Sequence, residues 1–324
     1  MSEPGHTSTR RTLTTLPSGV PIETTVHTYE GATDGPTLYV QAAQHGIEVN
    51  GTEVLRRFHE RLPLEDLAGT IIAVPIADPL TFDHVSYTTP RAIDHANPNM
   101  NRVWPGDEEG SLHERMAASL WDLIEDADAL VDLHTGSPDM WPHVVYLEGD
   151  LDSFALAEAF GTDLALSEQA NDDASEEWHD RNFSGKLRVA ATEAGIPSIT
   201  PELSHNKQIL EGPVEDGVEG LLNVARHLDM LPGEPPERDQ LIARNHLGRV
   251  LATESGLFRA NPDLECGEYL ESGTYVGTVY HPTTYEPLQE GVTERDGILY
   301  AHRKESTVTS GSQLAGIALL RDEP

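Results

Sequence analysis

One short polar stretch constrains this chain more than any other feature. The apolar run 37–43 is rich in strand-forming residues, and it gives way to polar residues up to Gly51, where helical spacing begins. In an open α/β sheet, ligands bind at the carboxyl end of such a strand. His45 and Glu48 stand there with two residues between them, so one turn of backbone can aim an imidazole and a carboxylate at a common point.

A third side chain of the same kind follows another apolar run. His134 comes just after 129–131, within Asp-Leu-His-Thr-Gly. Two imidazoles and a carboxylate form the donor set of a catalytic zinc site, which keeps its fourth position for water. A single His-x-x-Glu pair is compatible with a capped surface turn, but the addition of His134 favours a metal. The sequence therefore predicts one Zn²⁺ per chain, held by His45, Glu48 and His134.

Glu202 ends the predicted strand 198–202 and is the candidate general base. A carboxylate beside a metal-activated water can accept the proton of that water and pass it to a leaving amine. On its own, Glu202 is one of 55 acidic residues, so its position carries the argument. Asp132, two residues before His134, can orient that imidazole or simply lie at the end of a strand.

The segment 78–110 has no clear periodicity and is rich in Pro, Asn, Asp and Thr. A structureless segment of this length inside a compact domain is usually functional or disordered. Arg91, Asn101 and Arg102 lie in it. The guanidinium fork matches a carboxylate, so these residues are candidates for substrate binding, with salt bridges to nearby acids as the alternative.

Strands and helices alternate through the first two thirds of the chain, which predicts an α/β fold with a mostly parallel sheet flanked by helices. A Pro- and Gly-rich linker at 231–237 precedes a region of short strands separated by Gly, Pro, Asn and Asp. We therefore predict a catalytic domain over 1–235 and a smaller all-β domain over 236–324. Predicted strands are 20–29, 37–43, 70–76, 129–134, 143–147, 198–202, 257–259, 275–280, 298–302 and 315–319, and predicted helices are 50–61, 112–125, 151–160, 184–194 and 214–228.

The chain of 324 residues carries a net charge of −34. Such a surface repels nucleic acid and anionic membranes, so neither is an expected partner. Adaptation to concentrated salt, which screens self-repulsion, explains the acidity better than a cationic partner, and we predict a halophilic protein. The single Cys266 excludes an intramolecular disulfide, and the first residues lack a secretory apolar segment, so we expect a cytoplasmic protein, with a homo-oligomer possible.

Four motifs occur in an order that resembles one known family, the succinylglutamate desuccinylase/aspartoacylase family of the zinc carboxypeptidase clan. They are His45-Gly-Ile-Glu-Val-Asn-Gly51, Asn101-Arg-Val-Trp-Pro-Gly106, Asp132-Leu-His-Thr-Gly136 and Pro201-Glu-Leu203. The resemblance covers roughly residues 35–230. It implies a carboxypeptidase-like domain with one zinc, a β domain that narrows the mouth of the site, and hydrolysis of an N-acylated amino acid.

The resemblance also implies roles for single residues. It makes His45, Glu48 and His134 the zinc ligands and Glu202 the base. In its terms, Arg91 polarises the scissile carbonyl or stabilises the oxyanion, and Asn101 and Arg102 bind the substrate carboxylate. The sequence departs from the family's pattern at two places. Ala77-Asp-Pro79 stands where many members carry Asn-Pro, and the stretch between Arg91 and Asn101 differs in detail. These differences bear on which acyl group is recognised more than on which reaction is catalysed. The tail resembles a biotinyl/lipoyl-like fold, but no lysine lies between Lys207 and Lys304 to serve as an attachment site.

The resulting hypothesis is a zinc-dependent amidohydrolase that cleaves the linear amide of a small N-acyl amino acid or related carboxylate. Two alternatives remain open from the sequence. One is a zinc carboxypeptidase that acts on peptides, against which the β domain over the cleft argues. The other is a non-catalytic carboxylate-binding protein, which the full set of ligands and base makes the least favoured.

Overall fold

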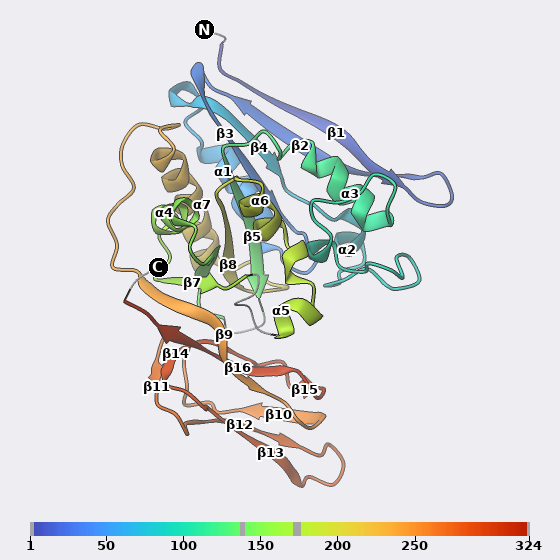
Figure 1. The fold of residues 1–324 in the computed structure, drawn as a ribbon, viewed down its shortest axis with the longest axis vertical. Helices are drawn as coiled ribbons and strands as arrows, with labels where there is room; N and C mark the ends of the chain where they lie inside the picture. Colours follow the sequence, from blue (N-terminus) through green and yellow to red (C-terminus); the bar gives the residue numbers. More distant parts are fainter. Residues whose placement is uncertain (1–2, 137–139, 171–175, 323–324) are drawn as a thin grey trace.

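The computed structural model describes residues 3–136, 140–170 and 176–322 (Figure 1). Within them, a twelve-stranded mixed sheet has the order β1-β2-β4-β3-β5-β8-β6-β7-β9-β16-β14-β11. Its strands are β1 Gly5–Thr15, β2 Pro21–Glu30, β3 Thr33–Ala42, β4 Ala68–Val74, β5 Ala129–Gly136, β6 His143–Leu147, β7 Leu164–Glu168, β8 Ser198–His205, β9 Leu241–Leu251, β11 Tyr269–Leu270, β14 Gly297–His302 and β16 Gln313–Leu320.

A second, four-stranded antiparallel sheet forms the end of the molecule opposite the N-terminus (Figure 1). Its strands are β10 Gly256–Ala260, β12 Tyr275–Tyr280, β13 Pro287–Val292 and β15 Thr307–Val308. The helices are α1 Asn50–Arg61, α2 Pro79–Asp83, α3 Leu112–Trp121, α4 Leu151–Phe160, α5 Glu176–Asp180, α6 Leu187–Glu193 and α7 Glu211–His227. None of the described helices is long and apolar enough to cross a membrane.

Helices cover both faces of the first half of the large sheet. Because strand side chains alternate between faces, Leu38 and Val40 of β3 pack with α1, α4 and α7, whereas Tyr39 packs with α3 and α6. Phe58 of α1 and Met116 of α3 are fully buried members of these two clusters. The strands in the middle of the sheet are therefore buried on both sides, as continuous apolar runs predict.

The direction of three neighbouring strands places the candidate residues together. β3, β5 and β8 are mutually parallel, so their carboxyl ends lie at one edge of the sheet. In this register His134 of β5 stands opposite Glu202 of β8. The loop that carries His45 and Glu48 leaves the end of β3 and leads directly into α1.

The predicted fold class is confirmed, with differences at the edges. The edge strand is β1, which is not among the strands predicted from the sequence, and it pairs antiparallel with β2. β7 and β9 were not predicted; β7 pairs in parallel with the preceding strand β6 and with the remote β9, which in turn pairs with β16. The residues 167–182 are acidic and polar, and the sequence predicts a surface loop there; the segment lies partly outside the described residues, its first two residues belong to β7, and its described end contains α5.

The large sheet also continues across the predicted domain boundary. Leu164 of β7 pairs in parallel with Leu241 of β9, which starts the C-terminal part. A shared apolar cluster, including Leu166, Ala243 and Tyr300, packs at the same junction. The boundary at 235 stays a prediction, but the two parts share one hydrogen-bonded sheet.

A buried histidine anchors the irregular segment between α2 and α3. His113 of α3 has its Nε2 atom 3.2 Å from Asp78 Oδ2 and its Nδ1 atom 3.1 Å from Asp94 Oδ2. Asp78 also caps α2, and Asp94 accepts backbone hydrogen bonds from residues 96 and 97. Burial lowers the pKa of His113, but the two carboxylates outweigh burial and raise it. One imidazole thus holds both ends of this segment.

We expect His113→Leu to lower the free energy of unfolding by about 3–5 kcal/mol, because it leaves two buried carboxylates without their partner. Since the folded pKa of His113 is raised, its stabilising contribution is fully present below about pH 6.5 and is lost as the pH rises through the folded pKa. Chemical denaturation at pH 6 and pH 9 measures both effects. The exposed His95 provides the control, and His95→Leu should leave stability nearly unchanged. Equal stability of the two variants would contradict the anchoring role.

Candidate metal centre and active site

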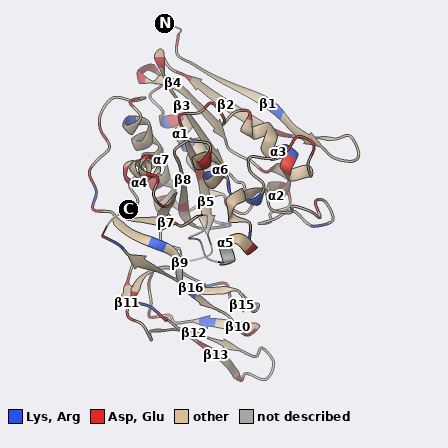
Figure 2. Ribbon diagram, viewed as in Figure 1, with Lys and Arg blue, Asp and Glu red and all other residues tan. Residues whose placement is uncertain are grey.

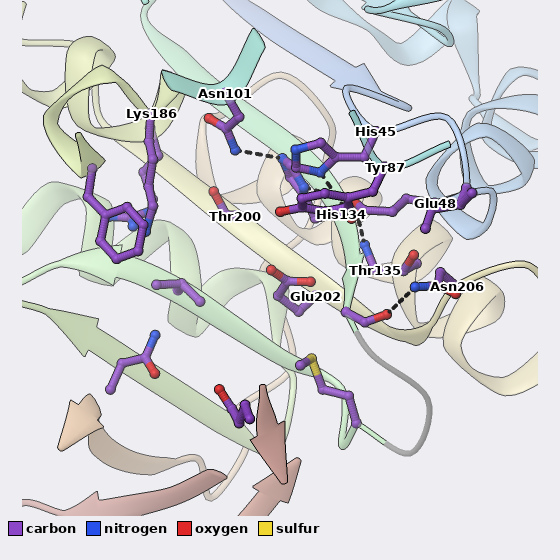
Figure 3. A pocket seen from close by; sticks show the side chains of 18 of the residues that line it. His45, Glu48, Tyr87, Asn101, His134, Thr135, Lys186, Thr200, Glu202 and Asn206 are labelled. Atoms are coloured by element: carbon purple, nitrogen blue, oxygen red, sulfur yellow. Dashed lines mark hydrogen bonds and ion pairs between the residues drawn. The ribbon is translucent and has the colours of Figure 1, made fainter. Parts of the chain in front are cut away.

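The three predicted ligands meet at one buried point (Figure 3). His45, Glu48 and His134 each offer an atom that lies within 4.8 Å of the other two, and together they could hold a metal ion. Glu48 is fixed by the backbone N–H of Thr135, which donates to Oε2 at 3.1 Å. Gly46 lets the loop approach α2 closely, because a Cβ atom there would lie 2.0 Å from the carbonyl oxygen of Thr81.

The hydrogen bonds of Asn99 define the tautomer of His45. The backbone N–H of Asn101 donates to Asn99 Oδ1 at 2.9 Å, which identifies this atom as the oxygen. His45 Nε2 lies 3.2 Å from the same oxygen, so it must carry the hydrogen and donate. The lone pair of neutral His45 is therefore on Nδ1, which faces Glu48 Oε1 at 3.0 Å.

Asp132 does the same for His134. Its Oδ2 atom lies 2.9 Å from His134 Nε2, and amide groups of Gln41 and Gln44 donate to the two carboxylate oxygens. The Nδ1 atom of His134 faces Glu48 Oε2 at 2.9 Å. A carboxylate that holds the outer nitrogen of a ligand imidazole is the usual outer contact of a metal site.

In these contacts the Nδ1 atoms of His45 and His134 face the carboxylate oxygens of Glu48, and all of these atoms are hydrogen-bond acceptors. Such an arrangement is favourable only when a positive charge lies between them. Both Nδ1 lone pairs point at Glu48, whose pKa burial raises but the two imidazoles lower to about 2. Burial lowers the pKa of His134, yet Asp132 and Glu48 outweigh burial and raise it. The site thus favours a cation at this point, and a divalent metal bound by two Nδ1 atoms and a carboxylate fits the residues present.

Glu202 lies in the same cavity, and one of its two carboxylate oxygens accepts no hydrogen bond from the described residues. Its Oε2 atom is buried and has no hydrogen-bond partner among the described residues. Burial raises the pKa of Glu202 to about 7, with Glu48 and Asp132 adding to the rise and His134 and Lys186 opposing it. A carboxyl group with this pKa can exchange protons near neutral pH.

The cavity around these residues has a volume of about 510 Å³ and is cationic. Seven lysines and arginines line it against four glutamates, whereas the whole chain has 21 Lys and Arg against 55 Asp and Glu. Figure 2 shows how widely the acidic residues are spread over the rest of the fold. The seven are Arg102, Arg181, Lys186, Arg188, Lys207, Arg249 and Arg303. The cavity is therefore suited to an anion.

Asn101 and Arg102, the residues predicted to bind a substrate carboxylate, both line the cavity. Asn101 Oδ1 accepts the backbone N–H of Leu187 at 3.0 Å, so its amide is held in place. The Arg102 guanidinium lies 4.8 Å from the ring centre of Phe183. Burial lowers the pKa of Arg102, although the group remains a cation in proteins.

A buried ion cluster that the sequence analysis missed lies on the same wall. Lys186 Nζ contacts Glu168 Oε1 at 2.6 Å, and Arg188 Nη2 contacts Glu168 Oε2. Arg188 is 3% exposed, and its Nε and Nη1 atoms have no partner among the described residues. One carboxylate thus serves two cations, which leaves net positive charge in the cavity.

The profile of the succinylglutamate desuccinylase/aspartoacylase catalytic domain matches residues 34–228, which is more than half of the chain. The chain belongs to this family. The resemblance found in the motifs is thereby confirmed. Family membership also supports hydrolase activity, because the family comprises deacylases of N-acyl amino acids.

The similar proteins match nearly the whole of this chain. N-alpha-acetyl-L-2,4-diaminobutyric acid deacetylase of Halomonas elongata is 29% identical over 311 residues, which cover 88% of this chain and 82% of that protein. The crystal structure of succinylglutamate desuccinylase/aspartoacylase from Rhodobacter sphaeroides has a TM-score of 0.83 and 24% identity, and covers 99% of this chain and 96% of its own. The product-bound ectoine utilization protein EutE (DoeB) from Ruegeria pomeroyi has a TM-score of 0.83 and 23% identity, over 98% and 95% of the two chains.

Arg91 is the one predicted site residue that does not line the cavity. Its side chain is exposed instead. Its role stays a prediction. Tyr87 and Asn99, which the sequence analysis did not single out, lie beside His45 instead. Two asparagines in Asn99-Met-Asn101 were visible, but nothing in the sequence showed that the first accepts from an imidazole.

We expect Asn99→Leu to weaken binding of a divalent metal by about 10–100-fold, because His45 loses the acceptor that fixes its tautomer. Asn99→Asp retains an acceptor at this position and should keep most of the affinity. Titration of apo-protein with Zn²⁺ in competition with a chelator measures both. Equal affinity for Asn99→Leu and wild type would show that Asn99 does not orient the ligand.

Proposed function

We propose that this protein is a zinc-dependent hydrolase that cleaves the amide bond of a small N-acyl amino acid or a related carboxylate. The observation that carries the proposal is the meeting of His45, Glu48 and His134 beside the unpaired carboxylate of Glu202 in a cationic cavity. A Zn²⁺ ion bound to these three residues would supply an activated water and polarise the amide carbonyl.

Glu202 acts as the proton carrier in this proposal. Its free Oε2 atom accepts a proton as water attacks the carbonyl carbon, and it returns that proton to the nitrogen as the C–N bond breaks. The products are the carboxylate of the acyl group and the free amine. The raised pKa of Glu202 supports both halves of this transfer near neutral pH.

Asn101 and Arg102 bind the substrate carboxylate in the proposed complex. They line the cavity near His134, with Asn101 Nδ2 3.5 Å from His134 Nε2, so a carboxylate held by them lies close to the metal ligands. The excess of cations supports an anionic substrate. The residues Asn245, Arg249, Arg303, Glu305 and Gln313 of the C-terminal part also line the cavity, which favours a small substrate over a long peptide.

The deciding experiment is a substrate panel with Zn²⁺-loaded protein in high salt. N-acetyl, N-succinyl and N-formyl amino acids are compared with short peptides, and release of free amine is measured. We expect turnover of acylated amino acids, including N-acetyl-2,4-diaminobutyrate as a candidate taken from the relative. Cleavage of peptides alone would favour the carboxypeptidase alternative, and binding without any turnover would favour the non-catalytic one.

Glu202→Gln tests whether the activity arises at this site. The variant keeps the size of the side chain but cannot accept the proton, so we expect kcat to fall by about 10²–10⁴-fold. Zinc content, measured by metal analysis, should not change, because Glu202 is not one of the three proposed ligands. Wild-type turnover in Glu202→Gln would refute its role.

We also propose that the acidic surface adapts the protein to high salt and that the protein is cytoplasmic; a homo-oligomer stays a prediction. With a net charge of −34, self-repulsion destabilises the compact state at low ionic strength. The midpoint of thermal unfolding should therefore rise steadily from about 0.1 M to about 2 M KCl, as the screening length shortens. A midpoint independent of KCl would exclude this explanation of the charge.

A further inference from the structure

Tyr87 forms the wall of the cavity directly above a proposed metal ligand. Its ring stacks on the imidazole of His45, with 3.9 Å between ring centroids and 25° between planes (Figure 3). Although 43% of the residue is exposed, Tyr87 lines the cavity together with Glu48, His134 and Glu202. No hydrogen bond ties its hydroxyl to any described residue, so the O–H group is available to a ligand.

A tyrosine hydroxyl is protonated at neutral pH, because its ordinary pKa is about 10. Besides the proposed ligands and the proposed base, Arg102, the proposed carboxylate-binding residue, lines the same cavity as Tyr87. The Tyr87 hydroxyl is therefore a neutral donor in the wall of the site.

The segment that carries Tyr87 is held in place before any substrate binds. The backbone N–H of Ser86 donates to the carbonyl of Thr81 at 3.0 Å. On the other side, Thr89 donates its N–H to the carbonyl of Pro98 at 2.9 Å, and its hydroxyl lies 3.2 Å from Nε2 of the buried His113. A donor fixed in this way needs little reorganisation during a reaction.

Amide hydrolysis needs such a donor. When water attacks the carbonyl carbon, the π electrons of the carbonyl move to its oxygen, and a donor aimed at that oxygen lowers the barrier. Arg91, which the sequence assigned to the carbonyl, is exposed and outside the cavity lining. Lys186 and Arg188 each contact Glu168 and Arg102 is proposed to bind the substrate carboxylate, whereas Tyr87 stacks directly on a proposed metal ligand.

We propose that the hydroxyl of Tyr87 donates a hydrogen bond to the carbonyl oxygen of the scissile amide and stabilises the negative charge that develops there. The proton stays on Tyr87, while the proton of the attacking water goes to Glu202. The role rests on the proposed function and adds a catalytic residue to it. Because the Tyr87 hydroxyl is uncharged, it does not compete with Arg102 for the substrate carboxylate.

Tyr87→Phe is the decisive variant, because it keeps the ring on His45 and removes only the hydroxyl. We expect kcat to fall by about 100–1,000-fold, as for the loss of one oxyanion donor. KM and zinc content should stay close to wild type, since neither substrate carboxylate nor metal contacts change. Tyr269→Phe, which removes an exposed hydroxyl in β11, is the matched control and should retain full activity.

A binding measurement separates stabilisation of the transition state from other effects of the variant. A phosphonamidate analogue of the best substrate places a charged oxygen where the carbonyl oxygen becomes negative. Tyr87→Phe should bind this analogue more weakly by a factor similar to the loss in kcat, yet bind the product amino acid as wild type does. A variant that merely perturbs the cavity wall would weaken both ligands.

Three outcomes overturn the proposal. Wild-type kcat in Tyr87→Phe removes the role of Tyr87 and leaves the proposed function intact. A loss of kcat in Arg91→Gln with none in Tyr87→Phe assigns the carbonyl to Arg91, as the sequence predicted. Absence of turnover in the zinc-loaded wild type across the whole substrate panel refutes the proposed function, and the role of Tyr87 fails with it.

Discussion

The site depends on one electrostatic constraint, the convergence of two imidazole nitrogens on the carboxylate of Glu48. The outer nitrogens of His45 and His134 are committed to Asn99 and Asp132, so the inner ones present lone pairs to a group that is itself an acceptor. Such a contact is stable only around a positive charge. The parallel strands β3 and β5 make it possible, because parallel neighbours end at the same edge of a sheet.

The sequence predicted most of the site because its main residues follow apolar strands. His134 and Glu202 lie within β5 and β8, and the His45 loop follows β3, so strand direction alone brings them together. Tyr87 and Asn99 come from an irregular segment whose path depends on the burial of His113 between two distant aspartates. No local pattern encodes that contact.

The fold shows a similar division. The helix Asn50–Arg61 lies where the sequence predicts one, because the helical spacing of its apolar residues is a local signal. The strands β7 and β9 were missed, and they pair with each other although they are remote in sequence. The gathering of cations in one cavity was likewise hidden, because Lys186, Arg249 and Arg303 are far apart along the chain.

The pairing of β7 with β9 also determines how the cavity can change shape. Backbone hydrogen bonds run without interruption from the strands of the metal site into the strands that bear Arg249 and Gln313. A hinge between the two halves would have to break this ladder, at the cost of several buried hydrogen bonds. The continuous sheet therefore opposes a clamshell motion of the two parts of the chain that line the cavity.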